Sequence, residues 1–194
     1  MIDEAAARNS GVGTLNMIAT DWSRDGRFLA TAAGAPIDLW LFDVTGTKPP
    51  ERIVSSPGDQ LHGNFSPDGK FIADTSNEAR QHFEVYVETL PPSDRKWPIS
   101  TNGGYEPRWR ADGREIYYLA RDGTLMAVPV TAGASPFGVP QPLFQTRVHS
   151  GVTMTRTHYV PNRDGSRFLV GVRTRDPVPV AITVMLNWTA GPKQ

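Results

Sequence analysis

The stretch FSPDGKFIA, from Phe65 to Ala73, decides the fold because it contains a tight turn between two apolar segments. Pro67 supplies the fixed φ of the second turn position, and Asp68 is tolerated at the third. Gly69 takes the left-handed conformation that closes a hairpin with a bulge. We therefore predict two antiparallel strands that meet at this turn.

The same turn recurs along the chain. In-phase Asp-Gly pairs begin at Asp25, Asp68, Asp112 and Asp164, at spacings of 43, 44 and 52 residues. Three of the four repeats have an aromatic residue three positions before the Asp, and all four have Leu, Ile or Phe three positions after the Gly. Four short strands in a unit of this length are typical of a β-propeller blade. A β-sandwich would also contain many short strands, but it would not repeat with this period.

We therefore predict an all-β protein, a β-propeller of about four four-stranded antiparallel blades. Third strands are expected at 37–44, 83–90, 124–130 and 180–188, and fourth strands at 51–55, 96–100 and 141–145. The expected blades are 17–58, 59–104, 105–147 and 148–190, with a linker or blade remnant at 1–16 and a tail at 191–194. The fourth repeat departs from the pattern, because Asn162-Arg163 replaces Ser-Pro and Pro161 stands where an apolar residue is expected.

The composition excludes several classes of partner and site. Lys+Arg and Asp+Glu both number 20, so the chain lacks the basic excess of a nucleic-acid binder. There is no Cys, which excludes disulfides and thiolate metal sites. No uninterrupted apolar run is long enough for membrane insertion by this segment, and residues 1–7 do not have the pattern of a signal peptide.

The sequence contains no catalytic motif that we recognise. A kinase Gly-rich loop with its lysine, His-Arg-Asp and Asp-Phe-Gly are all missing, as is the Gly-x-Ser-x-Gly of a serine hydrolase. Gly11-Val12-Gly13 is interpreted as linker, and the four histidines lack the local spacing of a zinc site. The periodic Asp residues could form a carboxylate ring for Ca²⁺, but a hairpin turn needs Asp-Gly there in any case. We expect no enzyme activity, metal or cofactor in this chain.

Residues 65–73 resemble the WD40-like repeat of TolB-type propellers, whose core is an aromatic-Ser-Pro-Asp-Gly-Lys-x-Ile-Ala run. More narrowly, the chain resembles the C-terminal propeller of membrane-anchored bacterial serine/threonine protein kinases, at 21–29, 97–101, 140–146 and 182–188. The resemblance implies a non-catalytic protein-interaction or sensory scaffold module on the periplasmic or extracytoplasmic side. Any kinase activity would reside in a domain outside this chain.

Two alternatives to the kinase-linked module stay open. The chain could be a TolB-like envelope interaction protein without a kinase, or the propeller of a serine peptidase that lacks its hydrolase domain. Propellers of the resembling family have six to eight blades, so four blades imply the C-terminal part of a larger protein and an incomplete ring. We expect the exposed blade edges to pair with the missing blades or with another chain.

Binding is expected on the rim opposite the Asp-Gly turns, because loops on a rigid scaffold often carry recognition. The mixture of arginines, histidines and one aromatic residue on that rim suits a protein or peptide partner better than a lipid; an ordinary solvated rim is the alternative. The in-phase aromatics Trp22, Phe65 and Trp109 are expected to pack between blades rather than to stack on nucleobases. The candidate binding residues are His62, Arg80, His82, Tyr105, Glu106, Arg108, Arg121, His149 and Arg156.

Overall fold

The computed structural model describes residues 17–54, 56–79, 82–133, 135–148, 152–153, 157–172 and 183–186. These residues form fifteen β-strands and no helix. None of the described residues belongs to a helix that could cross a membrane. The prediction of an all-β protein is therefore confirmed.

The strands are grouped into four antiparallel sheets, which we call blades 1 to 4, and each sheet keeps the order of the chain. Blade 1 comprises β1 (Ile18–Trp22), β2 (Phe28–Gly34), β3 (Ile37–Asp43) and β4 (Glu51–Val54). Blade 2 comprises β5 (Gln60–Phe65), β6 (Phe71–Ser76), β7 (Glu84–Thr89) and β8 (Lys96–Pro98). Blade 3 comprises β9 (Gly104–Trp109), β10 (Glu115–Ala120), β11 (Thr124–Pro129) and β12 (Gln141–Gln145). Blade 4 has three described strands, β13 (Tyr159–Pro161), β14 (Arg167–Val170) and β15 (Thr183–Leu186).

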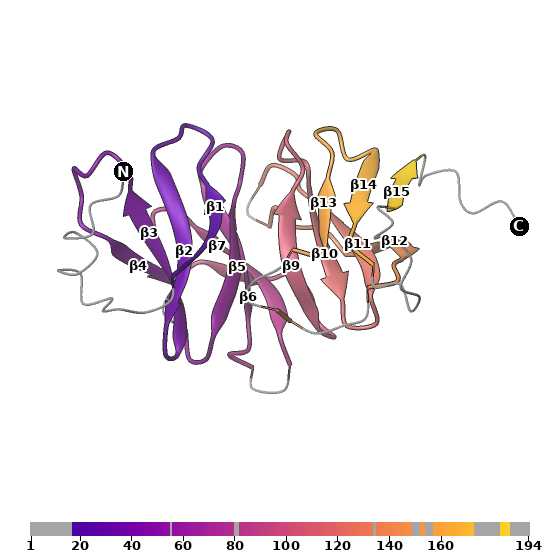
Figure 1. Ribbon diagram of the computed structural model, residues 1–194, viewed down its shortest axis with the longest axis horizontal. Coiled ribbons are helices and arrows are strands. Elements are labelled where there is room, and N and C mark those ends of the chain that lie inside the picture. Colours follow the sequence, from indigo (N-terminus) through magenta and orange to yellow (C-terminus); the bar gives the residue numbers. More distant parts are fainter. Residues whose placement is uncertain are drawn as a thin grey trace, which may run out of the picture.

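The blades stand side by side in chain order, from indigo blade 1 to yellow-orange blade 4 (Figure 1). The predicted turn joins the first two strands of every blade. Its glycines, Gly26, Gly69, Gly113 and Gly165, have φ values of 72°, 70°, 76° and 74°, in the left-handed region that suits a residue without a Cβ. In blade 2 the N–H of Gly69 donates to the Ser66 carbonyl at 2.9 Å, which closes the turn.

The core of the protein lies between the blades, because the inner blades bury both faces of their sheets. In β6 the side chain of Ile72 packs toward blade 1, whereas the next residue, Ala73, packs toward blade 3. This alternation is the two-residue period of a strand. Between blades 1 and 2 the apolar cluster contains Leu39, Ile53, Leu61, Phe65 and Ile72. Between blades 2 and 3 it contains Ala73, Val85, Val87, Trp109, Ile116 and Val128. Between blades 3 and 4 it contains Tyr105, Tyr117, Leu119, Tyr159 and Phe168.

The in-phase aromatics differ in their surroundings. Phe65 and Trp109 are only 7% and 8% exposed, because each packs against the preceding blade, as expected. Trp22, at the same repeat position in blade 1, is 58% exposed. The expectation of blade-to-blade packing therefore fails for Trp22, since no described blade stands on that side of blade 1.

Candidate functional site

One position of the repeat, just before the Asp-Gly turn on the first strand side of each blade, carries a polar side chain in three blades. We call β1, β5, β9 and β13 the inner strands, because β1 contacts β5 and β5 contacts β9 across neighbouring blades. Six residues before the Asp of each in-phase turn stand Ala19, His62, Glu106 and His158, in blades 1 to 4. Blades 2, 3 and 4 therefore each place one histidine or glutamate at an equivalent point.

The backbone at two of these positions departs from regular strand geometry. The pairing register shifts between Leu61 and Asn64 in β5, and it shifts again where β9 passes Glu106. His62 and Glu106 both have a φ of 57°, which residues other than glycine seldom adopt. A β-bulge re-aims a side chain, and such local strain concentrates at functional sites. The shared bulge identifies this pair as the centre of a candidate site.

Glu106 joins three blades through hydrogen bonds, although its side chain is fully buried. Its carboxylate accepts from the backbone N–H of His158 at 2.7 Å, and His158 Nδ1 lies 2.5 Å from the other carboxylate oxygen. The Tyr159 hydroxyl donates to the Glu106 carbonyl at 2.9 Å. On the other side, the N–H of Glu106 donates to Thr75 Oγ1 of blade 2 at 3.1 Å. Glu106 is therefore held from blades 2 and 4 together.

His62 is buried in the same network. Its Nε2 lies 2.7 Å from the carbonyl oxygen of Thr153, which can only accept, so Nε2 carries the proton. Its Nδ1 lies 3.2 Å from Thr75 Oγ1, and the Thr75 hydroxyl therefore donates to the ring while it accepts from Glu106. Burial lowers the pKa of His62, which favours this neutral ring over the imidazolium.

Arg108 adds a positive charge at the edge of this network. Its guanidinium donates to Thr157 Oγ1 at 2.9 Å, and so links blade 3 to the segment that precedes β13. We call the resulting set the inner-strand cluster; it consists of His62, Thr75, Glu106, Arg108, His158 and Tyr159.

The structure divides the predicted binding residues into two groups. His62, Glu106 and Arg108 belong to the inner-strand cluster. His82, Tyr105 and Arg121 instead line a shallow neighbouring pocket of about 240 Å³, where His82 Nε2 lies 2.7 Å from Glu84 Oε1. Tyr105 is also part of the core between blades 3 and 4, because it is only 4% exposed. Arg80, His149 and Arg156 lie outside the described residues.

Sequence reasoning missed Thr75, His158 and Tyr159 as members of the cluster. The signal that could have found His158 is the phase of the repeat, because it stands at the position of His62 and Glu106. No comparable signal exists for Thr75, which reaches the cluster from β6. It is brought there by strand pairing and by the contact of β6 with β9.

The inner-strand cluster is a largely buried polar network rather than a set of free reactive groups. Both carboxylate oxygens of Glu106 and both ring nitrogens of His62 have partners within the protein. Within the described residues, no group of three or more His, Asp or Glu side chains could hold a metal ion. Such a network holds blades 2, 3 and 4 together through side chains that are bonded to one another.

The chain is similar to several solved propeller structures. TolB from Acinetobacter baumannii aligns with a TM-score of 0.64 and 19% identity, over 90% of this chain and 42% of that one. The β-propeller domain of Cps50 (Swd1) from Myceliophteria thermophila aligns with a TM-score of 0.53 and 14% identity, over 80% of this chain and 52% of that one.

The fold is a β-propeller. A puromycin-hydrolyzing peptidase from Mycobacterium tuberculosis also aligns, with a TM-score of 0.63 and 14% identity, over 87% of this chain and 31% of that one. The chain therefore spans less than two thirds of the length of each of these proteins. No protein-family model matches the sequence. At these identities the likeness shows the propeller fold, with TolB-like and peptidase propellers among the similar structures.

Proposed function

We propose that this chain is a non-catalytic protein-interaction or sensory module, the propeller of a bacterial receptor-type serine/threonine protein kinase. The observation that carries the non-catalytic part is the closed hydrogen bonding of Glu106 and His62. An acid–base group needs a free proton site at the substrate, whereas these two side chains are bonded to neighbouring blades. The network stabilises the scaffold and shapes the surface around it.

The outer faces of the first and last blades support a place within a larger propeller. Met17 and Trp22 are exposed on blade 1, and Val160 and Leu169 are exposed on the face of blade 4 that points away from blade 3. The equivalent faces of blades 2 and 3 bury their aromatic residues against neighbours. Exposed apolar faces of this kind are typical of interaction surfaces. We infer that further blades, or a second chain, cover them.

The TolB-like alternative has its own support, because TolB from Acinetobacter baumannii is among the similar structures. In that case the module would interact with envelope proteins and would have no kinase attached. The likeness to the Mycobacterium tuberculosis peptidase supports a third candidate, a propeller that accompanies a hydrolase domain. All three proposals share a propeller that holds a partner.

Isolation of the native protein separates these proposals. An antibody raised against this chain would recover the full-length product from cells, and mass spectrometry would identify its other domains. The kinase proposal expects a kinase domain and one membrane-spanning helix on the N-terminal side. A signal peptide with a small α/β domain would instead support the TolB-like alternative, and a domain with Gly-x-Ser-x-Gly would support the peptidase alternative.

The non-catalytic part is tested on the purified chain. We expect no phosphoryl transfer from ATP and Mg²⁺ to a general protein substrate, and no release of chromophore from aminoacyl p-nitroanilides. Turnover in either assay that disappears in a Glu106→Gln variant would overturn the assignment of the inner-strand cluster as a scaffold.

A further inference from the structure

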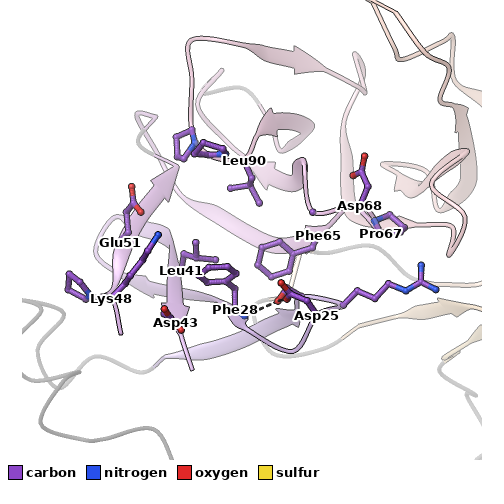
Figure 2. A pocket seen from close by; sticks show the side chains of 16 residues that line it. Asp25, Phe28, Leu41, Asp43, Lys48, Glu51, Phe65, Pro67, Asp68 and Leu90 are labelled. Carbon is purple, nitrogen blue, oxygen red and sulfur yellow. Dashed lines mark hydrogen bonds between the residues drawn. The ribbon is translucent and has the colours of Figure 1, made fainter. Parts of the chain in front are cut away.

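A pocket of about 470 Å³ lies between blades 1 and 2, on the rim of the Asp-Gly turns. This rim is the opposite one to the rim on which binding is expected from the sequence. Figure 2 shows that Phe28, Leu41 and Phe65 point toward one another across the pocket, with Leu90 above them. Pro49, Pro67, Pro91 and Pro92 complete the apolar lining. We call this the blade 1–2 pocket.

The equivalent place between blades 2 and 3 has the same aromatic wall. Phe71 follows its Asp-Gly turn as Phe28 does, and Trp109 precedes its turn as Phe65 does. The rings of Phe71 and Trp109 are stacked, with centroids 6.2 Å apart. The two gaps between blades are therefore built on one plan.

The gap between blades 2 and 3 is filled by two more aromatic side chains. Phe137, from the connection between β11 and β12, lies 5.8 Å from Phe71 and 6.3 Å from Trp109, measured between ring centroids. Trp97 of β8 lies 5.4 Å from Phe137 by the same measure. An aromatic side chain is thus what this architecture accommodates between two blades.

Neither filling side chain has an aromatic counterpart at the blade 1–2 pocket. Trp97 of β8 pairs with Val87 of β7. At the equivalent place in blade 1, Leu41 of β3 pairs with Glu51. The connection after β7 begins with Leu90, Pro91 and Pro92, where the connection after β11 supplies Phe137. These substitutions leave the pocket open beside Phe28, which is partly exposed, whereas Phe65, which also lines it, is only 7% exposed.

The charged residues around the blade 1–2 pocket are predominantly acidic. Asp25, Asp43, Glu51 and Asp68 line it, against Arg24 and Lys48. Arg24 is engaged elsewhere, because its guanidinium donates to the carbonyl of Ala111 at 3.2 Å. Glu51 is exposed, and the structure gives its carboxylate no bonded partner among the described residues. Asp43 and Asp68 are already paired with Arg27 and Lys70, at 3.6 Å and 3.8 Å. Glu51 is therefore the carboxylate at the mouth of the pocket that can take a positively charged neighbour.

We propose that the blade 1–2 pocket binds a partner peptide through an aromatic side chain flanked by Arg or Lys. The aromatic side chain takes the place that Phe137 and Trp97 occupy in the next gap, and the basic residue lies against Glu51. A buried aromatic anchor with a polar rim is the usual anatomy of a strong interaction site. The proposal rests on the proposed function as an interaction module, and it names the chemistry of one partner.

The test uses fluorescein-labelled peptides and fluorescence polarisation on the full chain. The probe is Gly-Arg-Trp-Arg-Gly, and the matched peptides are Gly-Arg-Ala-Arg-Gly and Gly-Glu-Trp-Glu-Gly. We expect the probe to bind at least about tenfold more tightly than either matched peptide, as a buried aromatic anchor and charge complementarity predict. Equal affinities for all three peptides, or no binding of the probe at millimolar concentration, would overturn the proposal.

A variant that copies the neighbouring gap locates the site. Glu51→Trp places a tryptophan where blade 2 has Trp97, so it fills the pocket from within and is expected to weaken probe binding at least about tenfold. Glu51→Gln removes only the charge and is the matched control, with an expected loss of about threefold. Full binding by Glu51→Trp, with its fold verified by circular dichroism, would place the peptide elsewhere and overturn the pocket. The interaction module of the previous section would survive that outcome, because it has a separate test, the absence of turnover by the purified chain.

Discussion

The backbone N–H of Trp109 donates a hydrogen bond of 2.9 Å to Asn64 Oδ1, across the boundary between blades 2 and 3. The same bond occurs one blade earlier, where the N–H of Phe65 donates to Asp21 Oδ2 at 2.8 Å. Asp21 and Asn64 each stand four residues before the Asp of their turn. An acceptor at this repeat position therefore ties blade 1 to the aromatic residue of blade 2, and blade 2 to that of blade 3.

We predict that Asn64→Ala destabilises the protein by about 1–3 kcal/mol, because the buried N–H of Trp109 loses its only acceptor among the described residues. The measurement is the free energy of unfolding in urea. Asn102→Ala, at an exposed loop position, is the control and should be neutral within about 0.5 kcal/mol. Equal effects of the two substitutions would show that the bond between blades contributes nothing.

The boundary between blades 3 and 4 lacks both partners of this hydrogen bond. Arg108 occupies the acceptor position, although a guanidinium carries only donors, and Pro161 occupies the aromatic position without an N–H to donate. We predict that Pro161→Phe alone is destabilising, because it creates an N–H with no acceptor, and that Arg108→Asn relieves that cost. A double-mutant cycle should show a favourable coupling of about 1 kcal/mol. Strictly additive effects would contradict this explanation of the irregular fourth repeat.

The buried pair of Glu106 and His158 provides a test of charge in the inner-strand cluster. His158→Ala removes the ring beside a fully buried carboxylate, so we expect a loss of about 3 kcal/mol in the free energy of unfolding. Adding Glu106→Gln to that variant should recover part of the loss, since the second substitution removes the unpaired charge. A double variant that is less stable than His158→Ala would contradict the assignment.

The buried carboxyl group of Asp74 should make the free energy of unfolding depend on pH. Its carboxyl group is fully buried in β6, and neither oxygen has a hydrogen-bond partner among the described residues. Burial raises the pKa of Asp74 well above 3.8, with nearby Glu88 and Glu78 adding to the rise and Lys96 opposing it. The folded protein therefore keeps a proton that the unfolded chain releases, so stability falls as pH increases above about 4.

Asp74→Asn removes this penalty without changing the shape of the side chain. We expect the variant and the wild type to unfold alike at about pH 3, and the variant to be more stable by about 1–3 kcal/mol at about pH 8. Asp94→Asn, at an exposed position, should leave the pH profile unchanged. A constant difference between Asp74→Asn and wild type over the whole pH range would exclude titration of Asp74 as the cause.

The exposed outer faces predict that the isolated chain associates. Trp22 on blade 1 and Val160 on blade 4 are 58% and 52% exposed. We expect multi-angle light scattering to show dimers or larger species, and the double variant Trp22→Lys with Val160→Lys to be monomeric. Val139→Lys changes an exposed apolar residue away from those faces and should have no effect. A monomeric wild-type chain would count against further blades on these faces.

The sequence predicts the parts of the fold that depend on short-range chemistry. Each in-phase Asp-Gly turn and the strands that flank it follow from Pro, Asp and Gly at fixed turn positions, and the turn glycines have the expected φ. Exposure was harder to predict, because it depends on the neighbouring blade. Trp22 and Trp109 share a repeat position, yet only Trp109 has a described blade in front of it.

The candidate site shows the same division between local and non-local information. The in-phase positions of His62 and Glu106 are visible in the sequence, but their bulges and their shared partner Thr75 are not. Tyr105 was predicted on the binding rim, and the structure places it in the core between blades 3 and 4. The blade 1–2 pocket depends on comparing two gaps in space, so no single motif predicts it.

Hydrogen exchange of three backbone amides, followed by NMR, tests the arrangement of the blades most directly. The N–H groups of Phe65 and Trp109 point across blade boundaries to Asp21 and Asn64, so both should exchange slowly. The amide of Trp22 stands at the same repeat position, but no neighbouring blade offers it an acceptor and its one partner is the carboxylate of the adjacent Asp21, so it should exchange faster. Exchange at Phe65 and Trp109 as fast as at Trp22 would show that the sheets do not pack as propeller blades.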